Sequence, residues 1–137
     1  MKNKVSLCLI MLLLPMLSNQ VIACDIDNIF KGNLELHTIY DKKLHHEKSL
    51  IKASTQRNKL IRTTVVGEII RVKWSNWLVK DTKDNVIGYI DGNLMFSAKN
   101  ALCKNQIIKL EYRTNNKYFV TKNNRLIAEI NGRLPRM

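Results

Sequence analysis

Apolar and polar residues alternate over much of the second half of the chain, a pattern typical of β-strands. The longest stretch, LIRTTVVGEIIRVKW (60–74), is rich in β-branched residues and centred on Gly67. Its strand-forming residues change parity at the glycine: Ile61, Thr63 and Val65 before it, then Ile70, Val72 and Trp74 after it. A bulge at Gly67 would return both sets to one side, so we expect a long strand with a bulge there.

Shorter alternating segments follow this strand. WLVKD (77–81) and VIGYID (86–91) flank TKDN, whose residues favour turns, and together they predict a hairpin. QIIKLEYR (106–113) alternates, with apolar residues on one face and charged residues on the other. TNNK then turns the chain, and YFVTKNNRLIAEI (118–130) predicts either a final strand or a tight hairpin.

Two segments have a spacing closer to that of a helix. NLMFSAKNALC begins with an asparagine suited to an N-cap, and four residues recur at i, i+4, i+7 and i+8: Leu94, Ala98, Ala101 and Leu102. Residues 33–56 are polar, and a weak apolar stripe passes through Leu36, Tyr40, Leu44 and Ile51. We therefore expect a short helix over 94–102 and partly helical structure over 33–56.

The first 23 residues are organised like an export signal. Lys2 and Lys4 precede the apolar run VSLCLIMLLLPM, and the short polar segment SNQVIA ends in a small residue. The apolar run is shorter than the ~20 residues that a membrane-spanning helix requires. We predict a signal peptide over 1–23 and a periplasmic or secreted product of 114 residues, 24–137.

Cys24 follows the predicted cleavage site and allows two outcomes. V-I-A-C resembles a bacterial lipobox, which implies a lipoprotein anchored to the membrane through Cys24. The polar segment Ser18-Asn19-Gln20 separates it from the apolar run and favours the soluble product instead. In that case Cys8 departs with the signal, and Cys24 and Cys103 predict one disulfide in an oxidising compartment. Lipidation would leave Cys103 unpaired.

The composition is strongly basic. Without Lys2 and Lys4, 21 basic side chains stand against 11 acidic ones, a formal charge of +10. This excess suits anionic partners such as lipid headgroups, acidic polysaccharide, acidic proteins or nucleic acid. General solubility and the codon usage of an AT-biased genome explain the excess equally well.

The expected order is a long bulged strand, two hairpin strands, a short helix and further strands. This order resembles the OB-fold, a Greek-key barrel of five strands. The segments that carry the resemblance are TTVVGEIIRV, WLVKDTKDNVIGYI, NLMFSAKNAL and KNQIIKLEYR. They look similar to small exported bacterial OB domains, among them the tRNA-anti-like group. The resemblance implies an all-β, OB-like barrel of five to six strands over 59–137, with a short helix between strands three and four, after a partly helical segment over 24–58.

Candidate catalytic residues are few. His45-His46-Glu47 departs from the zinc-protease pattern His-Glu-x-x-His, because position 50 is a leucine. On a helix, His37, Asp41 and His45 would form a stripe able to hold a metal, although such residues more often make a solvated face. The chain lacks a G-x-S-x-G elbow, a phosphate-binding glycine loop and the nuclease pattern R-x-x-x-x-D-x-P-E. We predict no enzymatic activity, no metal and no cofactor.

OB barrels bind ligands on the face of strands two and three and on the flanking loops. The resemblance therefore implies a basic-aromatic face in which rings stack beside cations: Arg71, Lys73, Trp77, Lys80, Tyr89, Arg113, Lys117 and Tyr118. Any single aromatic residue of this set could fill the barrel instead. The leading hypothesis is an exported, non-enzymatic binding module for a protein or an anionic envelope component. The alternatives are an envelope lipoprotein with an interaction role and an exported single-stranded nucleic-acid binder, which is less favoured because exported proteins rarely meet such strands.

Overall fold

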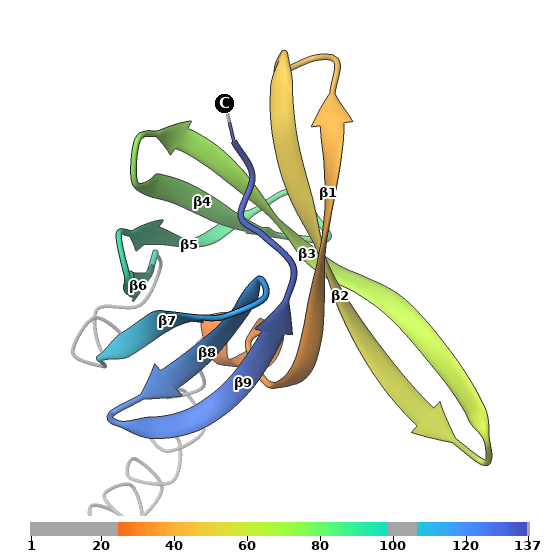
Figure 1. The fold of residues 1–137 in the computed structure, drawn as a ribbon. Coiled ribbons are helices and arrows are strands. Elements are labelled where there is room, and N and C mark those ends of the chain that lie inside the picture. Colours follow the sequence, from red (N-terminus) through yellow and green to blue (C-terminus); the bar gives the residue numbers. More distant parts are fainter. Residues whose placement is uncertain (1–24, 99–106, 137) are drawn as a thin grey trace, which may run out of the picture.

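Nine strands and one short helix make up the part of the chain that the structure describes, residues 25–98 and 107–136 (Figure 1). In this computed structural model the elements are, in chain order, α2 (Asp25–Ile29), β1 (Gly32–Asp41), β2 (His46–Arg57), β3 (Leu60–Lys73), β4 (Asn76–Asp81), β5 (Val86–Asp91), β6 (Leu94–Ser97), β7 (Ile108–Arg113), β8 (Lys117–Lys122) and β9 (Arg125–Asn131).

The strands follow one another around a closed barrel, and each pairs antiparallel with the next. The barrel closes where β1 pairs with β9 in parallel, from Gly32 beside Ala128 to Glu35 beside Asn131. The predicted β-barrel is therefore confirmed. The expected five to six strands are wrong, since the described ranges hold nine: both segments expected to be helical contribute strands.

Residues 33–56 form a β-hairpin instead of the expected partly helical segment. On β1, Leu34 and Leu36 are buried while Glu35 and His37 are exposed, which is the two-residue period of a strand. The apolar stripe was ambiguous because a spacing of four is even, so residues at i and i+4 share a face of a strand as well as a face of a helix. β1 and β2 belong to the same barrel as the later strands.

The helix expected over 94–102 is wrong in its first turn, because β6 spans Leu94–Ser97. Met95 and Ser97 are buried while Leu94 is exposed, again a period of two. Met95 pairs with Ile108 of β7, so β6 closes the sheet between β5 and β7. The later part of that predicted helix lies outside the described residues.

The predicted bulge at Gly67 is present. Ile51 of β2 pairs with Gly67, and the next residue, Lys52, pairs with Val65. Val66 is therefore the extra residue of β3, and the parity change of the sequence is absorbed at this point.

The bulge brings the residues before and after it to one side of β3, as the parity change predicted. Val65 pairs with Lys52, and Ile70 pairs with Lys48 on the same face of β2. That side is the outer one, since Val65 is 40% exposed and Ile69, on the opposite face, is only 1% exposed. Parity alone did not indicate which side would face the core.

The hairpin predicted over 77–91 is present as β4 and β5. In the β4–β5 turn, the Asp81 carboxylate accepts hydrogen bonds from the Lys83 and Asn85 amides, each at 2.9 Å. The final segment is a hairpin and not one strand: β8 and β9 turn at Asn123 and Asn124, whose φ angles are 51° and 66°. Asparagine tolerates these left-handed values, which two-residue hairpin turns require.

α2 and the residue that follows it fill part of the barrel interior with three apolar side chains. Ile26, Ile29 and Phe30 are 1%, 6% and 1% exposed. Two glycines leave space for them, since a Cβ on Gly88 would lie 2.8 Å from Ile26 Cδ1 and a Cβ on Gly67 would lie 3.2 Å from Ile29 Cδ1. The strands supply the rest of the core: Leu34, Leu36, Ile51, Ile69, Val79, Ile87, Ile90, Met95, Ile108, Leu110, Val120, Ala128 and Ile130.

The segment after β9, residues 132–136, runs beside β1 and β2 toward β4 (dark blue in Figure 1), and we call it the C-terminal strap. The Ser49 hydroxyl donates a hydrogen bond to the Arg133 carbonyl at 3.2 Å. Trp77 Nε1 donates to the Pro135 carbonyl at 3.1 Å. Because Ser49 is fully buried, the strap supplies the acceptor that its hydroxyl needs.

Cys24 and Cys103 lie outside the described residues, as does the predicted signal peptide. The disulfide, the lipidation and the cleavage therefore remain predictions. Among residues 25–98 and 107–136, no helix has the length and apolar character that a bilayer crossing requires.

Candidate functional site

Two aromatic residues of the predicted basic-aromatic face point toward the barrel interior. Trp77 pairs with Ile90, which is 1% exposed, and its Nε1 is bound by the Pro135 carbonyl. Tyr118 packs against the core, and burial raises the pKa of its hydroxyl. The Arg71 guanidinium lies 5.8 Å from the centroid of the Trp77 ring. The chain itself therefore packs part of each ring, and both side chains are half-buried.

The cations of the predicted face are distributed over different parts of the sheet. Lys73 ends β3 and is exposed. Lys80 of β4 forms an ion pair with Asp84 of the following turn, with Nζ 3.1 Å from the carboxylate. Arg113 and Lys117 lie opposite each other across the β7–β8 hairpin, where Arg113 has an acidic partner of its own. The structure thus brings Arg71 to Trp77 and Arg113 to Lys117, while Lys80 is paired within its own hairpin.

Tyr89 faces outward and belongs to a row of apolar side chains that crosses four neighbouring strands. Ile70 of β3 pairs with Leu78 of β4, Leu78 pairs with Tyr89 of β5, and Tyr89 pairs with Phe96 of β6. The Tyr89 and Phe96 rings stack, with centroids 5.2 Å apart and an interplanar angle of 26°. We call these four residues the outer apolar row.

A shallow groove of about 260 Å³ runs beside the outer apolar row. Its apolar lining includes Val72, Leu78 and Tyr89, while Asn76 and Asp91 give it polar edges. Val72 is 48% exposed and Tyr89 40%, so both remain accessible to a partner. Trp74, in the turn that follows β3, is the most exposed aromatic side chain of the described residues, at 84%.

Sequence reasoning found only one member of the row, Tyr89. Ile70 and Leu78 were not identified because each lies next to a core residue in an unbroken apolar run. Ile70 follows Ile69, and Leu78 precedes Val79. Adjacent residues on a strand point to opposite faces, so such a pair must place one side chain outside. The pairs Ile69-Ile70 and Leu78-Val79 were therefore a usable signal for an apolar outer face.

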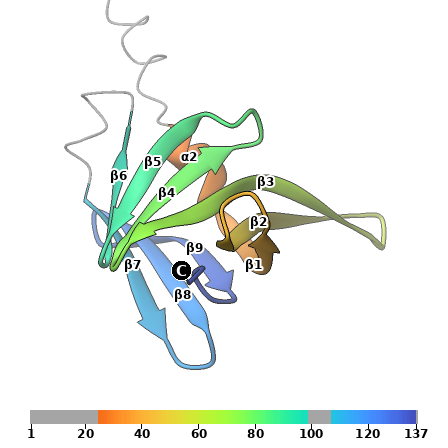
Figure 2. The same cartoon turned by 90° about the horizontal axis from the view of Figure 1, so that it is seen from above.

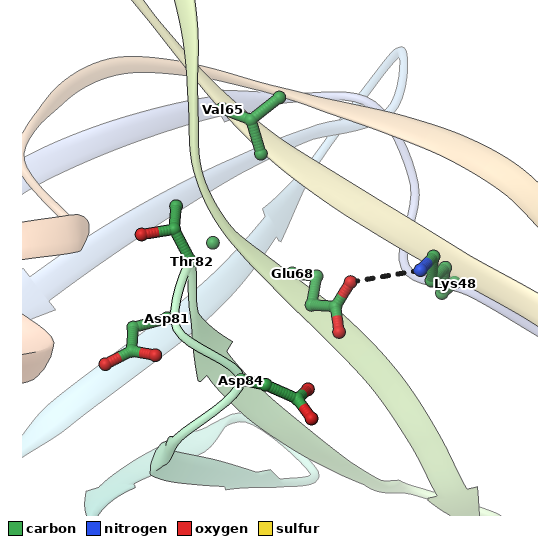
Figure 3. Close-up of a pocket in the computed structure, with 7 residues that line it drawn as sticks. Lys48, Val65, Glu68, Asp81, Thr82 and Asp84 are labelled. Carbon is green, nitrogen blue, oxygen red and sulfur yellow. Dashed lines mark ion pairs between the residues drawn. The ribbon is translucent and has the colours of Figure 1, made fainter.

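A second hollow, of about 380 Å³, lies between the bulged part of β3 and the β4–β5 turn (Figure 3). Lys48 extends toward it from β2, and its Nζ lies 3.2 Å from Glu68 and 3.3 Å from Asp41. Asp84 stands on the turn, and the Asp81 carboxylate is engaged by the amides of that same turn.

The cation of this hollow, Lys48, is held by two carboxylates, those of Glu68 and Asp41. Burial lowers the pKa of Lys48, but the hydrogen bonds and charges of Glu68 and Asp41 outweigh burial and raise that pKa overall. Lys48 therefore keeps its proton, whereas a catalytic lysine must lose it to act as a base or nucleophile. The hollow is an ion-pair cluster that links β1, β2 and β3.

The metal stripe considered for a helical 33–56 is wrong. His37 and Asp41 lie on β1, and His45 lies in the turn after it. Four residues along a strand span about 13 Å, which is too far for two ligands of one ion. His37 Nδ1 instead lies 2.9 Å from Lys52 Nζ. Nowhere in the described ranges do three His, Cys, Asp or Glu side chains gather in a way that could hold a metal ion.

No model of a known family, no curated protein and no solved structure matches this chain. The resemblance to exported OB domains stays a prediction.

Proposed function

We propose that the protein is an exported, non-enzymatic binding module that holds another protein against the outer apolar row. The observation that carries the proposal is the continuity of the row: Ile70, Leu78, Tyr89 and Phe96 adjoin on four neighbouring strands. The barrel core lies on the opposite face of the same strands, so the row is not needed to fill the interior. Contiguous apolar patches on an outer face mark sites of association.

The surroundings of the row fit contact with a protein. Apolar residues lie at its centre, and Asn76 and Asp91 border the groove, as the polar rim borders the core of a protein interface. Tyr89 supplies an exposed aromatic ring, the residue type that most often dominates binding energy at such sites.

Export and the absence of catalysis rest on the sequence. The first 23 residues have the organisation of a signal peptide, which supports a periplasmic or secreted protein. The sequence contains none of the catalytic patterns considered above, and the cation of the charged hollow, Lys48, is held by Asp41 and Glu68. Single-stranded nucleic acid is less favoured, because the chain itself packs part of Trp77 and Tyr118, two of the predicted stacking rings.

Site-specific photocrosslinking in the native host tests the proposal. A benzophenone amino acid at position 89, on the row, is compared with the same amino acid at position 126. Leu126 is a matched control because it is an apolar residue of β9 that is 51% exposed. We expect a discrete adduct with a second protein from position 89 and none of that mass from position 126.

A second variant tests whether the adduct depends on the apolar surface of the row. Leu78→Asp places a charge in the row without entering the core, so the barrel should fold while the adduct from position 89 disappears. Identical adducts from positions 89 and 126 would overturn the proposal. A crosslink formed only within the chain would also overturn it, because the protein itself would then cover the row.

A further inference from the structure

The hairpin formed by β2 and β3 extends beyond the barrel as a two-stranded arm (Figures 1 and 2). β1 pairs with β2 only as far as Ala53, and β4 pairs with β3 only from Gly67 onward. Residues 54–65, which we call the β-arm, therefore have no third strand. They turn at Asn58 and Lys59, whose φ angles of 52° and 68° suit a two-residue hairpin turn.

Every residue of the β-arm is exposed. At its tip, Leu60 and Ile61 are 75% and 71% exposed, the highest values among the large aliphatic residues of the described chain. A two-stranded hairpin alone is at best marginally stable in water. A protruding arm with two exposed aliphatic side chains at its tip is suited to contact with a partner that covers them.

The charge of the β-arm is of one sign. Arg57, Lys59 and Arg62 lie within it, and residues 54–65 contain no acidic residue. None of these three cations forms an ion pair with a described residue. Elsewhere on the barrel, five cations are paired with carboxylates: Lys48, Lys80, Arg113, Lys122 and Arg133.

The two arginines share one face of the arm. Arg57 pairs with Leu60, and Thr55 pairs with Arg62, so the four side chains stand on the same side of the hairpin. With Asn58 they line a hollow of about 300 Å³. Two guanidinium groups beside such a hollow are suited to a phosphate, to which arginine donates paired hydrogen bonds.

From this arrangement we infer that the β-arm docks on the surface of an anionic phospholipid bilayer. Arg57 and Arg62 bind headgroup phosphates, Lys59 adds attraction to the negative surface, and Leu60 and Ile61 enter the boundary between headgroups and acyl chains. A bilayer fits better than an acidic protein or polysaccharide, because the apolar residues lie at the very tip of a projecting arm, where they reach a flat surface first. This site is distinct from the outer apolar row, so either proposal can fail without the other.

Cosedimentation of the purified protein with vesicles tests the inference. One set of vesicles contains phosphatidylglycerol and phosphatidylcholine in equal parts, and the other contains phosphatidylcholine alone. We expect binding to the first set only, weakened by added salt as surface charges are screened. Arg57→Gln with Arg62→Gln should weaken binding about 25-fold, at roughly fivefold for each cation beside an anionic surface. Leu60→Ser with Ile61→Ser should weaken it by about tenfold or more.

The matched control is Lys42→Gln with Lys43→Gln, which removes the same charge from exposed positions in the β1–β2 turn. It should change binding by no more than about twofold, and all three variants should keep the thermal unfolding midpoint of the parent. Failure of the parent protein to bind the anionic vesicles would overturn the inference. So would equal losses in the arginine variant and the lysine control, since general charge would then explain binding. Unchanged vesicle binding in the Leu60 and Ile61 variant would overturn the insertion of the tip, since charge alone would then explain binding.

Discussion

The Arg133 guanidinium faces the Glu47 carboxylate in parallel, with Nη1 2.8 Å from Oε1 and Nη2 2.5 Å from Oε2. The pair joins the C-terminal strap to β2 across 86 positions of the sequence. The Arg136 amide adds a third hydrogen bond, to Glu47 Oε1 at 3.0 Å. One carboxylate thus fixes the path of the last described residues over the barrel.

This pair should make the stability of the protein fall in acid. The hydrogen bond from Arg133, followed by the one from the Arg136 amide, lowers the pKa of Glu47 from its ordinary 4.5 to about 2. A carboxyl group with a lower pKa in the folded state stabilises that state above the unfolded pKa, and the stabilisation is lost as the pH falls from about 4.5 to about 2. Because the pair is partly exposed, we expect a contribution of about 1 kcal/mol.

Urea unfolding of the parent protein and of Glu47→Gln, between about pH 7 and pH 2, measures this contribution. The variant should be less stable at neutral pH, and the difference should vanish toward pH 2. Glu129→Gln on β9 is the control, with no effect expected, because Glu129 has no ion pair with any described residue. An equal difference between the parent and Glu47→Gln at every pH would contradict the assigned pKa.

The two tryptophans should respond differently to the same substitution. Trp77→Phe removes the hydrogen bond to Pro135 and leaves the carbonyl of the strap without its donor, which should cost about 1–2 kcal/mol. Trp74→Phe should cost less than about 0.5 kcal/mol, because Trp74 is 84% exposed. Unfolding followed by circular dichroism compares them, and equal costs would mean that the Trp77 bond contributes nothing.

Gly88 should not accept even a methyl group. A Cβ there would lie 2.5 Å from the Phe96 carbonyl oxygen and 2.8 Å from Ile26 Cδ1, so Gly88→Ala should cost about 1–3 kcal/mol. Ile26→Val removes the second of these contacts, so the cost of Gly88→Ala should be smaller in that background but should not disappear. A double-mutant cycle of unfolding free energies gives the coupling between positions 26 and 88. Strict additivity would show that Ile26 of α2 does not contact a side chain at position 88.

α2 should be essential although it is short. Phe30 follows the helix and is 1% exposed, so Phe30→Ala should cost about 3–5 kcal/mol through lost burial and the cavity left behind. Leu126→Ala, at a position 51% exposed, should cost less than about 1 kcal/mol. Chemical denaturation of both variants measures these losses of stability. A small loss for Phe30→Ala would show that the barrel is stable without this buried side chain.

The turns and the bulge could be predicted because each is encoded by neighbouring residues. Asn123 and Asn124 tolerate left-handed backbone, and the parity change around Gly67 requires one extra residue in β3. The strands of 33–56 could not be separated from a helix, because a spacing of four satisfies both periods. Only the burial of Leu34 and Leu36, two residues apart, decides between them.

The candidate surfaces were predicted less well than the strands. Tyr89 was identified, but Phe96 was assigned to a helix, and Leu78 was hidden inside an apolar run. The β-arm was not predicted from the sequence, although residues 54–59 are all polar. Their exposure follows from where β1 and β4 stop pairing, which is a property of other segments.

The sequence alone determined the alternation of β3, β4, β5, β7, β8 and β9, the positions of their turns and the basic charge, because these depend on the chemistry of adjacent residues. The tertiary structure decided which parity faces the core, how many strands complete the barrel and where β1 meets β9. Gly32 and Ala128 become neighbours although 96 positions separate them. Such a pairing depends on the length and twist of every intervening strand, so no local pattern contains it.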